Sequence, residues 1–275
     1  MLVKKIGIVG IGLIGGSLGL AIKKYKLAKR VIGICRHRNT LQEALRRKAV
    51  DIATTDLNLL SDVDLVILAT PVGVIKEIAS LVSKTIRRNC IVTDVGSSKK
   101  EIVLKLEKLF CNYVGSHPLT GSHNIGVKFA DPTIFKNSLC ILTPTKNTSR
   151  EVLFKIKELW EAVGARVDFL SPALHDKIIA FTSHLPHLVA FSLIDSLPVK
   201  YLKYSAGGLK DTTRLALSSP QLWRDIFISN HKETLGSLKQ FKERISFLEW
   251  LISKRDAEGL YIFLKKIQRK RSKIL

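Results

Sequence analysis

Cysteine is scarce in this chain of 275 residues, and its few copies stand far apart in the sequence. No two of them form a C-x-x-C pair, which argues against a zinc site and against a disulfide scaffold. We therefore expect no metal site, and we expect reduced thiols, as in a cytoplasmic protein, at Cys35, Cys90, Cys111 and Cys140.

Acidic residues are few as well: 23 Asp and Glu stand against 45 Lys and Arg, so the formal net charge is +22. This charge suits nucleic acid as a partner, or a phosphorylated cofactor with a carboxylate substrate. A solvated, lysine-rich surface is the alternative. The basic residues are spread along the chain without interleaved aromatic residues that would stack on bases, so we expect no nucleic-acid partner.

Long hydrophobic runs are missing too. The charge-free stretch 6–22 superficially resembles a signal peptide or a short anchor, but six of its seventeen residues are glycine. It also falls short of the ~20 apolar residues that a bilayer requires. The apolar run 185–197 is interrupted by Pro186, His187 and Asp195. We expect a soluble, unexported protein with no membrane partner.

Short β-branched runs alternate with helical stretches over the first 170 residues. Such alternation indicates a mostly parallel sheet covered on both faces. The runs predict strands at 3–9, 31–35, 65–70, 90–95, 113–116, 139–143 and 166–170, and helices at 18–25, 41–48, 72–86, 99–110 and 150–163.

The pattern changes after residue 170. Ser171 and Pro172 form a good helix start, with serine as the N-cap and proline at the first helical position. Beyond them only helices are expected, at about 173–196, 208–217, 220–252 and 254–271. The sequence therefore predicts two domains, 1–170 and 171–275.

A glycine motif follows the first predicted strand and opens the first predicted helix. Gly10 permits a tight turn, Gly12 permits close approach of a pyrophosphate, and Gly15 permits close packing of helix on strand. The free N–H groups of the helix start, at Leu13 and Ile14, suit phosphate. Glycines in an ordinary turn are the alternative. The context favours an α/β Rossmann-type dinucleotide-binding domain followed by an all-α C-terminal domain.

The second predicted strand bears on the choice of cofactor. NAD-selective sites usually place an Asp or Glu at its end, about 20 residues beyond the glycines. Here Cys35 is followed by Arg36, His37 and Arg38. An arginine accepts a 2′-phosphate as a bidentate pair. We therefore expect NAD(P)+ as cofactor, with NADP+ slightly favoured over NAD+ and Arg36 as a contact. A solvated basic loop is a serious alternative.

Further cofactor contacts are expected where the third predicted strand ends, at Thr70 and Pro71. Other candidate site residues fall in four polar segments. Two follow predicted strands, where ligands of α/β sheets bind; the other two lie in the helical half. The segments are 94–99, 115–122, 183–187 and 207–214, with 223–225 shortly after.

A Gly-x-Gly-Leu-Ile-Gly-Gly-Ser loop followed by these four segments in this order resembles the prephenate dehydrogenase family over essentially the whole chain. The resemblance implies oxidative decarboxylation of prephenate to 4-hydroxyphenylpyruvate, in tyrosine biosynthesis. His117 matches the catalytic histidine, and a neutral imidazole suits a base near pH 7. Ser97 matches a serine near the same hydroxyl group. Substrate contacts are implied for Arg214, His187, Gly207 and Ser122.

The sequence departs from the family pattern at one position. Some relatives carry a glutamate six residues beyond the catalytic histidine, where this chain has His123. Relatives also form homodimers through the helical domain, and we expect the same here. Three other functions compete: arogenate dehydrogenase, another hydroxyacid dehydrogenase with a lysine base, and a non-catalytic nucleotide- or nucleic-acid-binding protein on the same fold. The contexts of His117 and Arg214 argue against the last two.

Overall fold

A computed structural model describes residues 1–121 and 124–274. The chain forms two compact units, Met1–Asn230 and His231–Leu275. A Rossmann-like sheet with its helices makes up most of the first unit, and the C-terminal part is helical, which confirms the expected fold class. By packing, the chain divides at residue 230, so the domain boundary at 170 stays a prediction.

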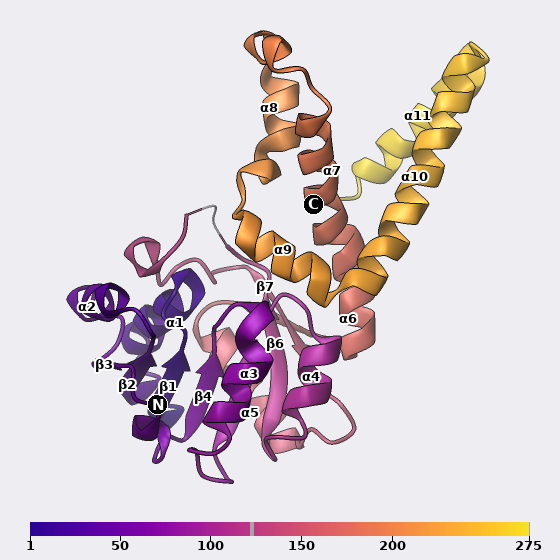
Figure 1. The fold of residues 1–275 in the computed structure, drawn as a ribbon. Helices are drawn as coiled ribbons and strands as arrows, with labels where there is room; N and C mark the ends of the chain where they lie inside the picture. Colours follow the sequence, from indigo (N-terminus) through magenta and orange to yellow (C-terminus); the bar gives the residue numbers. More distant parts are fainter. Residues whose placement is uncertain (122–123, 275) are drawn as a thin grey trace. The chain divides into compact units, whose positions relative to one another are not determined.

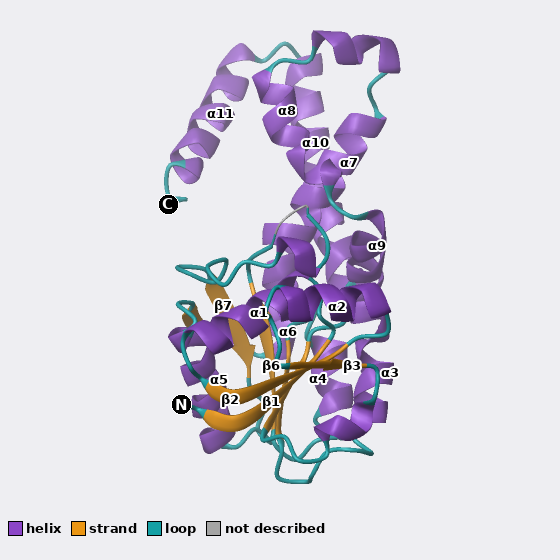
Figure 2. Cartoon of the chain, turned by 90° about the vertical axis from the view of Figure 1, so that its left-hand side faces the viewer, coloured by secondary structure: helices purple, strands orange, loops and turns teal. Residues whose placement is uncertain are grey.

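One twisted sheet of eight strands organises the first unit (Figures 1 and 2). Its order is β3-β2-β1-β4-β5-β6-β7-β8, and every neighbouring pair is parallel except β6 and β7. The strands are β1 (Val3–Val9), β2 (Ala28–Ile34), β3 (Ile52–Thr54), β4 (Leu65–Leu68), β5 (Ile91–Asp94), β6 (Tyr113–Pro118), β7 (Leu139–Thr143) and β8 (Arg166–Phe169).

Both faces of this sheet are buried, because alternate strand residues point to opposite sides. Ile6 and Ile8 of β1 pack into one core with Trp160, while Val9 belongs to the other core with Ile75. Of the helices, α1 (Leu13–Lys24) and α5 (Arg150–Ala162) contribute to the first core, and α3 (Val72–Val82) and α4 (Lys100–Leu106) to the second. Helix α2 spans Arg38–Arg46.

The helix predicted at 173–196 contains a π-helical turn. Helix α6 (Pro172–Ile179) is capped by Ser171, whose side chain accepts from the Leu174 N–H at 3.3 Å. The π turn, Ala180–His184, joins α6 to α7 (Leu185–Asp195). Pro186 explains the turn, because its ring excludes a regular hydrogen bond and crowds the preceding carbonyl groups.

The prediction of one helical stretch at 220–252 is wrong. The stretch is two helices, α9 (Pro220–Ser229) and α10 (His231–Ser253), which meet at Asn230. The Asn230 amide donates to the Asp176 carbonyl at 2.9 Å, so tertiary hydrogen bonding holds the break. The helix predicted at 208–217 is α8 (Gly207–Thr213) followed by a 3₁₀ turn, Arg214–Leu217.

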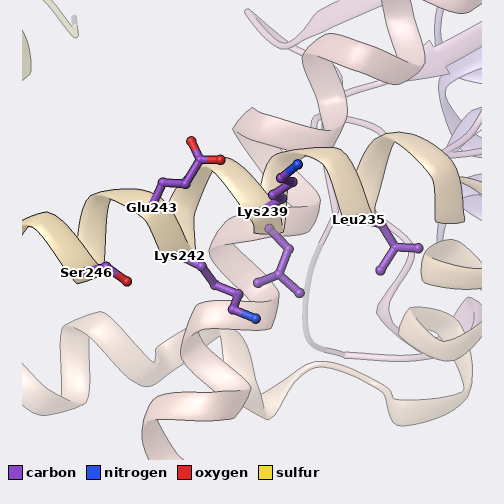
Figure 3. Close-up of a pocket in the computed structure, with 6 residues that line it drawn as sticks. Leu235, Lys239, Lys242, Glu243 and Ser246 are labelled. Carbon is purple, nitrogen blue, oxygen red and sulfur yellow. The ribbon is translucent and has the colours of Figure 1, made fainter.

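The second unit pairs α10 with α11 (Ala257–Arg271). Phe247 and Phe263 pack together between them, with ring centroids 5.5 Å apart. Residues of α10 alone, five of them labelled in Figure 3, line a hollow of about 590 Å³. A hollow lined by one solvated helix face lacks the convergent polar groups of a ligand site.

One segment, Pro172–Asp195, is long and apolar enough to cross a membrane by length and composition. This is weak evidence for a span. The segment carries His175, Asp176 and His184, which are buried and hydrogen-bonded inside the first unit. Such ionisable groups suit a protein interior more than hydrocarbon.

Candidate active site

The glycine loop has the backbone shape that its sequence predicts. Gly10 has φ of +99°, and a Cβ there would lie 2.5 Å from the Ala69 carbonyl oxygen. A Cβ on Gly15 would collide with the Gly10 carbonyl oxygen, so strand and helix approach as closely as only glycine allows. A Cβ on Gly12 meets nothing within 4 Å. The loop is therefore closed on the protein side and open at Gly12.

The start of α1 leaves donors available. Gly12 is its N-cap, no side chain caps it, and its first turn carries no acidic residue. The N–H groups of Leu13 and Ile14 thus stand at a helix terminus with partial positive charge. This open cradle fits a dinucleotide pyrophosphate.

Thr70 and Pro71 lie beside this loop. A Cβ on Gly10 would be 2.8 Å from the Thr70 nitrogen, so the end of β4 borders the glycine turn. The buried Thr70 hydroxyl has no hydrogen-bond partner among the described residues. A buried polar atom without a partner is costly, so a bound ligand there is physically reasonable.

Arg36 follows β2, and β2 ends beside the end of β1, where Ile34 pairs with Val9. Its side chain is exposed and makes no ion pair within the described part of the chain. No carboxylate occurs between Ile34 and Arg38. The structure thus places an available guanidinium group after the strand that usually carries the ribose-binding acid.

His117 lies on β6, between β5 and β7 in the sheet, and is buried. Its Nδ1 is 2.8 Å from Nε2 of His175, on α6, and Nδ1 of His175 is 2.8 Å from Oδ1 of Asp176. A strand and a helix thus join in an Asp–His–His chain of hydrogen bonds, with His117 and His175 58 positions apart in the sequence.

Electrostatics keep the two histidines neutral. Burial lowers the pKa of His117 well below its usual value, and nearby His175, Lys99 and His184 lower it further. Burial also lowers the pKa of His175, although Asp176 opposes that effect. A neutral imidazole is the form that accepts a proton.

Asp176 is anchored by the start of α4. Its two carboxylate oxygens accept from the backbone N–H groups of Lys99 and Lys100, at 2.7 and 2.9 Å. Burial alone would raise the pKa of Asp176, but the hydrogen bonds from His175 and from these N–H groups outweigh it and lower the pKa. Asp176 is therefore a carboxylate.

A second buried carboxylate, Asp94, shapes the loop between β5 and α4. It forms an ion pair with Lys99, and both side chains are fully buried. It also accepts from the Gly96 N–H at 2.8 Å and from the Tyr113 hydroxyl at 2.7 Å. Breaking such a pair leaves an uncompensated buried charge, so the loop is firmly held. Half-buried Ser97 lies within this loop.

His187 and Arg214 come together on the helical side of the first unit. The His187 ring stacks on Trp223, with centroids 3.4 Å apart, and its Nδ1 bonds to the Ser183 carbonyl at 2.9 Å. Burial lowers the pKa of His187, and the nearby positive charge of Arg214 adds to that effect. Arg214 itself is exposed.

The other expected substrate contacts differ in what the structure shows. Gly207 is exposed at the start of α8, and a Cβ there meets nothing within 4 Å. Ser122 and His123 lie outside the described residues. His184 interacts with both groups of histidines. It acts electrostatically on His117, and it packs edge-on against Trp223, the stacking partner of His187, with ring centroids 6.1 Å apart.

The sequence alone did not reveal His175, Asp176 or the role of Lys99. Lys99 closes a polar segment that the sequence singles out, but its complete burial could not be read there. His175 and Asp176 lie inside a predicted helix of apolar character, where adjacent ionisable residues are unusual. That oddity was the available signal.

Two family models match consecutive parts of this chain. The family model described as the nucleotide-binding domain of prephenate dehydrogenase matches residues 18–169, and the model of its dimerization domain matches 171–266. The chain belongs to the prephenate dehydrogenase family. Family membership makes it a dehydrogenase with a nucleotide-binding domain and agrees with the resemblance drawn from the sequence.

Individual relatives cover nearly the whole chain. Prephenate dehydrogenase of Bacillus subtilis is 34% identical over 94% of this chain and 72% of its own length. The crystal structure of prephenate dehydrogenase from A. aeolicus with hydroxyphenyl propionate and NAD+ is 34% identical, with a TM-score of 0.95 over 99% of this chain and 98% of that one. Synechocystis arogenate dehydrogenase is 30% identical, with a TM-score of 0.86 over 98% and 100%.

Proposed function

We propose that this chain is a prephenate dehydrogenase that converts prephenate to 4-hydroxyphenylpyruvate and CO2. The observation that carries the proposal is the buried, neutral His117 on β6, held by His175 and Asp176. Hydride departure from an alcohol carbon requires a base for the hydroxyl proton, and a fixed neutral imidazole meets that requirement. Family membership supplies the substrate class.

The proton balance of this reaction assigns His117 two tasks. The bound nicotinamide ring supplies the hydride acceptor. His117 takes the hydroxyl proton as hydride leaves the same carbon, which becomes a carbonyl. The ring carboxylate then leaves as CO2, its bonding electrons aromatise the ring, and His117 returns the proton to the oxygen. Burial suits both tasks, because it keeps the base neutral before the reaction.

Substrate recognition in this proposal relies on cationic and polar groups of the helical segment. Arg214 binds a carboxylate of the substrate, since a planar guanidinium group pairs with it through two hydrogen bonds. His187, stacked on Trp223, presents its other ring nitrogen to the substrate. Ser97, in the firmly held β5–α4 loop, bonds near the reacting hydroxyl. Gly207 and Ser122 complete the proposed substrate contacts.

Cofactor choice is a separate proposal: NADP+ is slightly favoured over NAD+. It depends on the exposed Arg36 guanidinium group and on the absence of a carboxylate between Ile34 and Arg38. The A. aeolicus relative was crystallised with NAD+, and we attribute the preference of this chain for NADP+ to Arg36. Comparing kcat/KM for both cofactors in wild type and Arg36→Ala tests this. We expect the NADP+/NAD+ ratio to fall about tenfold, which one charge-assisted contact supports. An unchanged ratio of the two kcat/KM values would mean that Arg36 does not select the cofactor.

Arogenate is the competing substrate, since one structural relative is an arogenate dehydrogenase. It differs from prephenate only at the side chain, so the chemistry at His117 would be the same. Reduced-nicotinamide absorbance and CO2 release with each substrate decide between them. We expect equal molar amounts of both products, and a higher kcat/KM for prephenate. A higher value for arogenate would reassign the substrate, and no reduction with either would refute the proposed function.

A further inference from the structure

The ring nitrogens of His117 are not equivalent in this structure, and the difference begins at Asp176. Asp176 accepts two backbone N–H groups, from Lys99 and Lys100, and is ionised. An ionised carboxylate has acceptors only. The 2.8 Å contact from Nδ1 of His175 to Asp176 Oδ1 therefore requires a proton on His175 Nδ1.

That proton determines the next hydrogen bond. A neutral imidazole with its proton on Nδ1 has a lone pair on Nε2. Nε2 of His175 lies 2.8 Å from Nδ1 of His117, so His117 must be the donor of this contact. The His117 proton then resides on Nδ1, and its Nε2 carries the lone pair.

The charged groups around the pair do not change this assignment. Lys99 lies nearby, but its ammonium group is paired with Asp94. His184, on the π turn, has a pKa lowered to about 4 by burial, so it is neutral near pH 7. The positive charge of Lys99 disfavours protonation of both His117 and His175. Each histidine thus holds one proton.

We propose that His175 and Asp176 are positioning residues that fix His117 in its Nδ1–H tautomer and so present Nε2 as the base. The inference rests on the proposed function for the identity of the reaction, but the tautomer itself does not. The same arrangement sets the angle of the His117 ring, because Asp176 is tied to the backbone of α4 and His175 belongs to α6.

Two substitutions of His175 separate this role from general packing. His175→Phe keeps an aromatic ring but removes both nitrogens, and the ring of His117 then loses its acceptor. His175→Gln restores an acceptor near the former Nε2. We expect kcat to fall about 10²-fold in His175→Phe, the scale of a slightly misplaced catalytic group. His175→Gln should recover most of that loss. KM and the cofactor Kd should change less than about threefold in both, since the placed substrate contacts remain.

A measurement without substrate tests the tautomer directly. The ¹⁵N shifts of the histidine rings in the full-length protein, assigned with His117→Asn, show which nitrogen carries the proton. We expect protonated Nδ1 at His117 in wild type and a mixed or reversed tautomer in His175→Phe. Exposed His231→Gln is the matched control, with wild-type kcat and an unchanged His117 signal.

The possible failures are distinguishable. A protonated Nε2 at His117 in wild type, or wild-type kcat in His175→Phe, overturns the positioning role and leaves the proposed function standing. Wild-type kcat in His117→Asn instead refutes the base assignment of the proposed function, whatever the ¹⁵N shifts show.

Discussion

At the scale of single residues, the site depends on burial more than on residue type. Burial lowers the pKa of four histidines of the first unit: His117, His175, His184 and His187. Three of them are almost completely enclosed. Each enclosed ring is hydrogen-bonded, which allows a polar cluster in a core.

Stability should therefore depend on pH through these histidines. An unfolded histidine binds a proton near its usual pKa of 6.5, whereas folded His184 binds one only near about 4. Between these values the unfolded state binds more protons, so the free energy of unfolding falls as pH falls. His184 alone accounts for a fall of up to ~3 kcal/mol in the free energy of unfolding. Denaturant titrations from pH 7 to 4 should show a smaller loss in His184→Gln than in wild type. The exposed His37→Gln variant should lose as much stability as wild type. An equal loss in wild type and both variants would mean that His184 does not cause the pH dependence.

Arg214 gives a prediction on substrate affinity. Arg214→Ala should raise KM for prephenate about tenfold or more, because a charge-assisted pair worth ~1.5–3 kcal/mol is lost. The kcat should change much less, since the base is untouched. Exposed Lys203, in the 3₁₀ stretch Val199–Tyr204 outside the candidate segments, is the matched control, and Lys203→Ala should leave KM near wild type. Equal KM increases in the two variants would mean that only general positive charge matters.

At the scale of elements, the junction of β1 and α1 has a closed side and an open side. Gly12→Ala adds a Cβ that meets no protein atom, and Gly12 has φ of −86°, which alanine adopts easily. We expect the free energy of unfolding to stay within ~0.5 kcal/mol of wild type. The cofactor Kd should rise at least about tenfold, because the methyl group occupies the space for the pyrophosphate.

The control for this substitution is Gly236→Ala, in α10, where a Cβ also meets nothing. It should leave the cofactor Kd unchanged and raise stability slightly, since alanine favours helix. Isothermal titration gives both affinities. An unchanged Kd for Gly12→Ala would place the pyrophosphate elsewhere.

Most elements of the sheet were predictable because buried parallel strands appear as short β-branched runs. The three-residue strand β3 was missed, since its residues are only half-buried. The reversal of β7 against β6 was not visible either, because strand direction depends on the connection and not on residue pattern. Asn230 breaks a periodic stretch through a contact with Asp176, 54 positions away.

Some residues of the candidate site were predictable from the sequence and others were not. Its glycine loop and His117 stand in local motifs, so their sequence context predicts them. His175 and Asp176 were hidden because their partners come from β6 and α4, and neither distance nor burial is written in the local sequence. Ion pairing of Lys99 with Asp94 was hidden for the same reason.

At the scale of the whole molecule, the C-terminal helices expose apolar side chains that one chain does not cover. Trp250 is 51% exposed and Ile252 63% exposed on α10, and Tyr261 is 56% exposed on α11. Large apolar side chains exposed on both helices are typical of a protein–protein interface. The match of residues 171–266 to a dimerization domain suggests a homodimer.

Sedimentation at micromolar concentration should give twice the chain mass of 30.7 kDa. Trp250→Glu should shift the protein toward monomer, because a charge is costly in an apolar interface. Phe154→Glu, at an exposed position on α5, should stay dimeric. A monomeric wild type would contradict a dimer built by the helical region.

We propose His117 as the base of a dehydrogenase reaction on prephenate. Steady-state formation of reduced nicotinamide by His117→Asn beside wild type, with prephenate saturating, tests this role. We expect kcat to fall by ~10²–10⁴-fold, as for loss of a general base. The cofactor Kd should stay near wild type, because the glycine loop joins β1 to α1 and His117 belongs to β6. Wild-type turnover in His117→Asn would show that His117 is not the base.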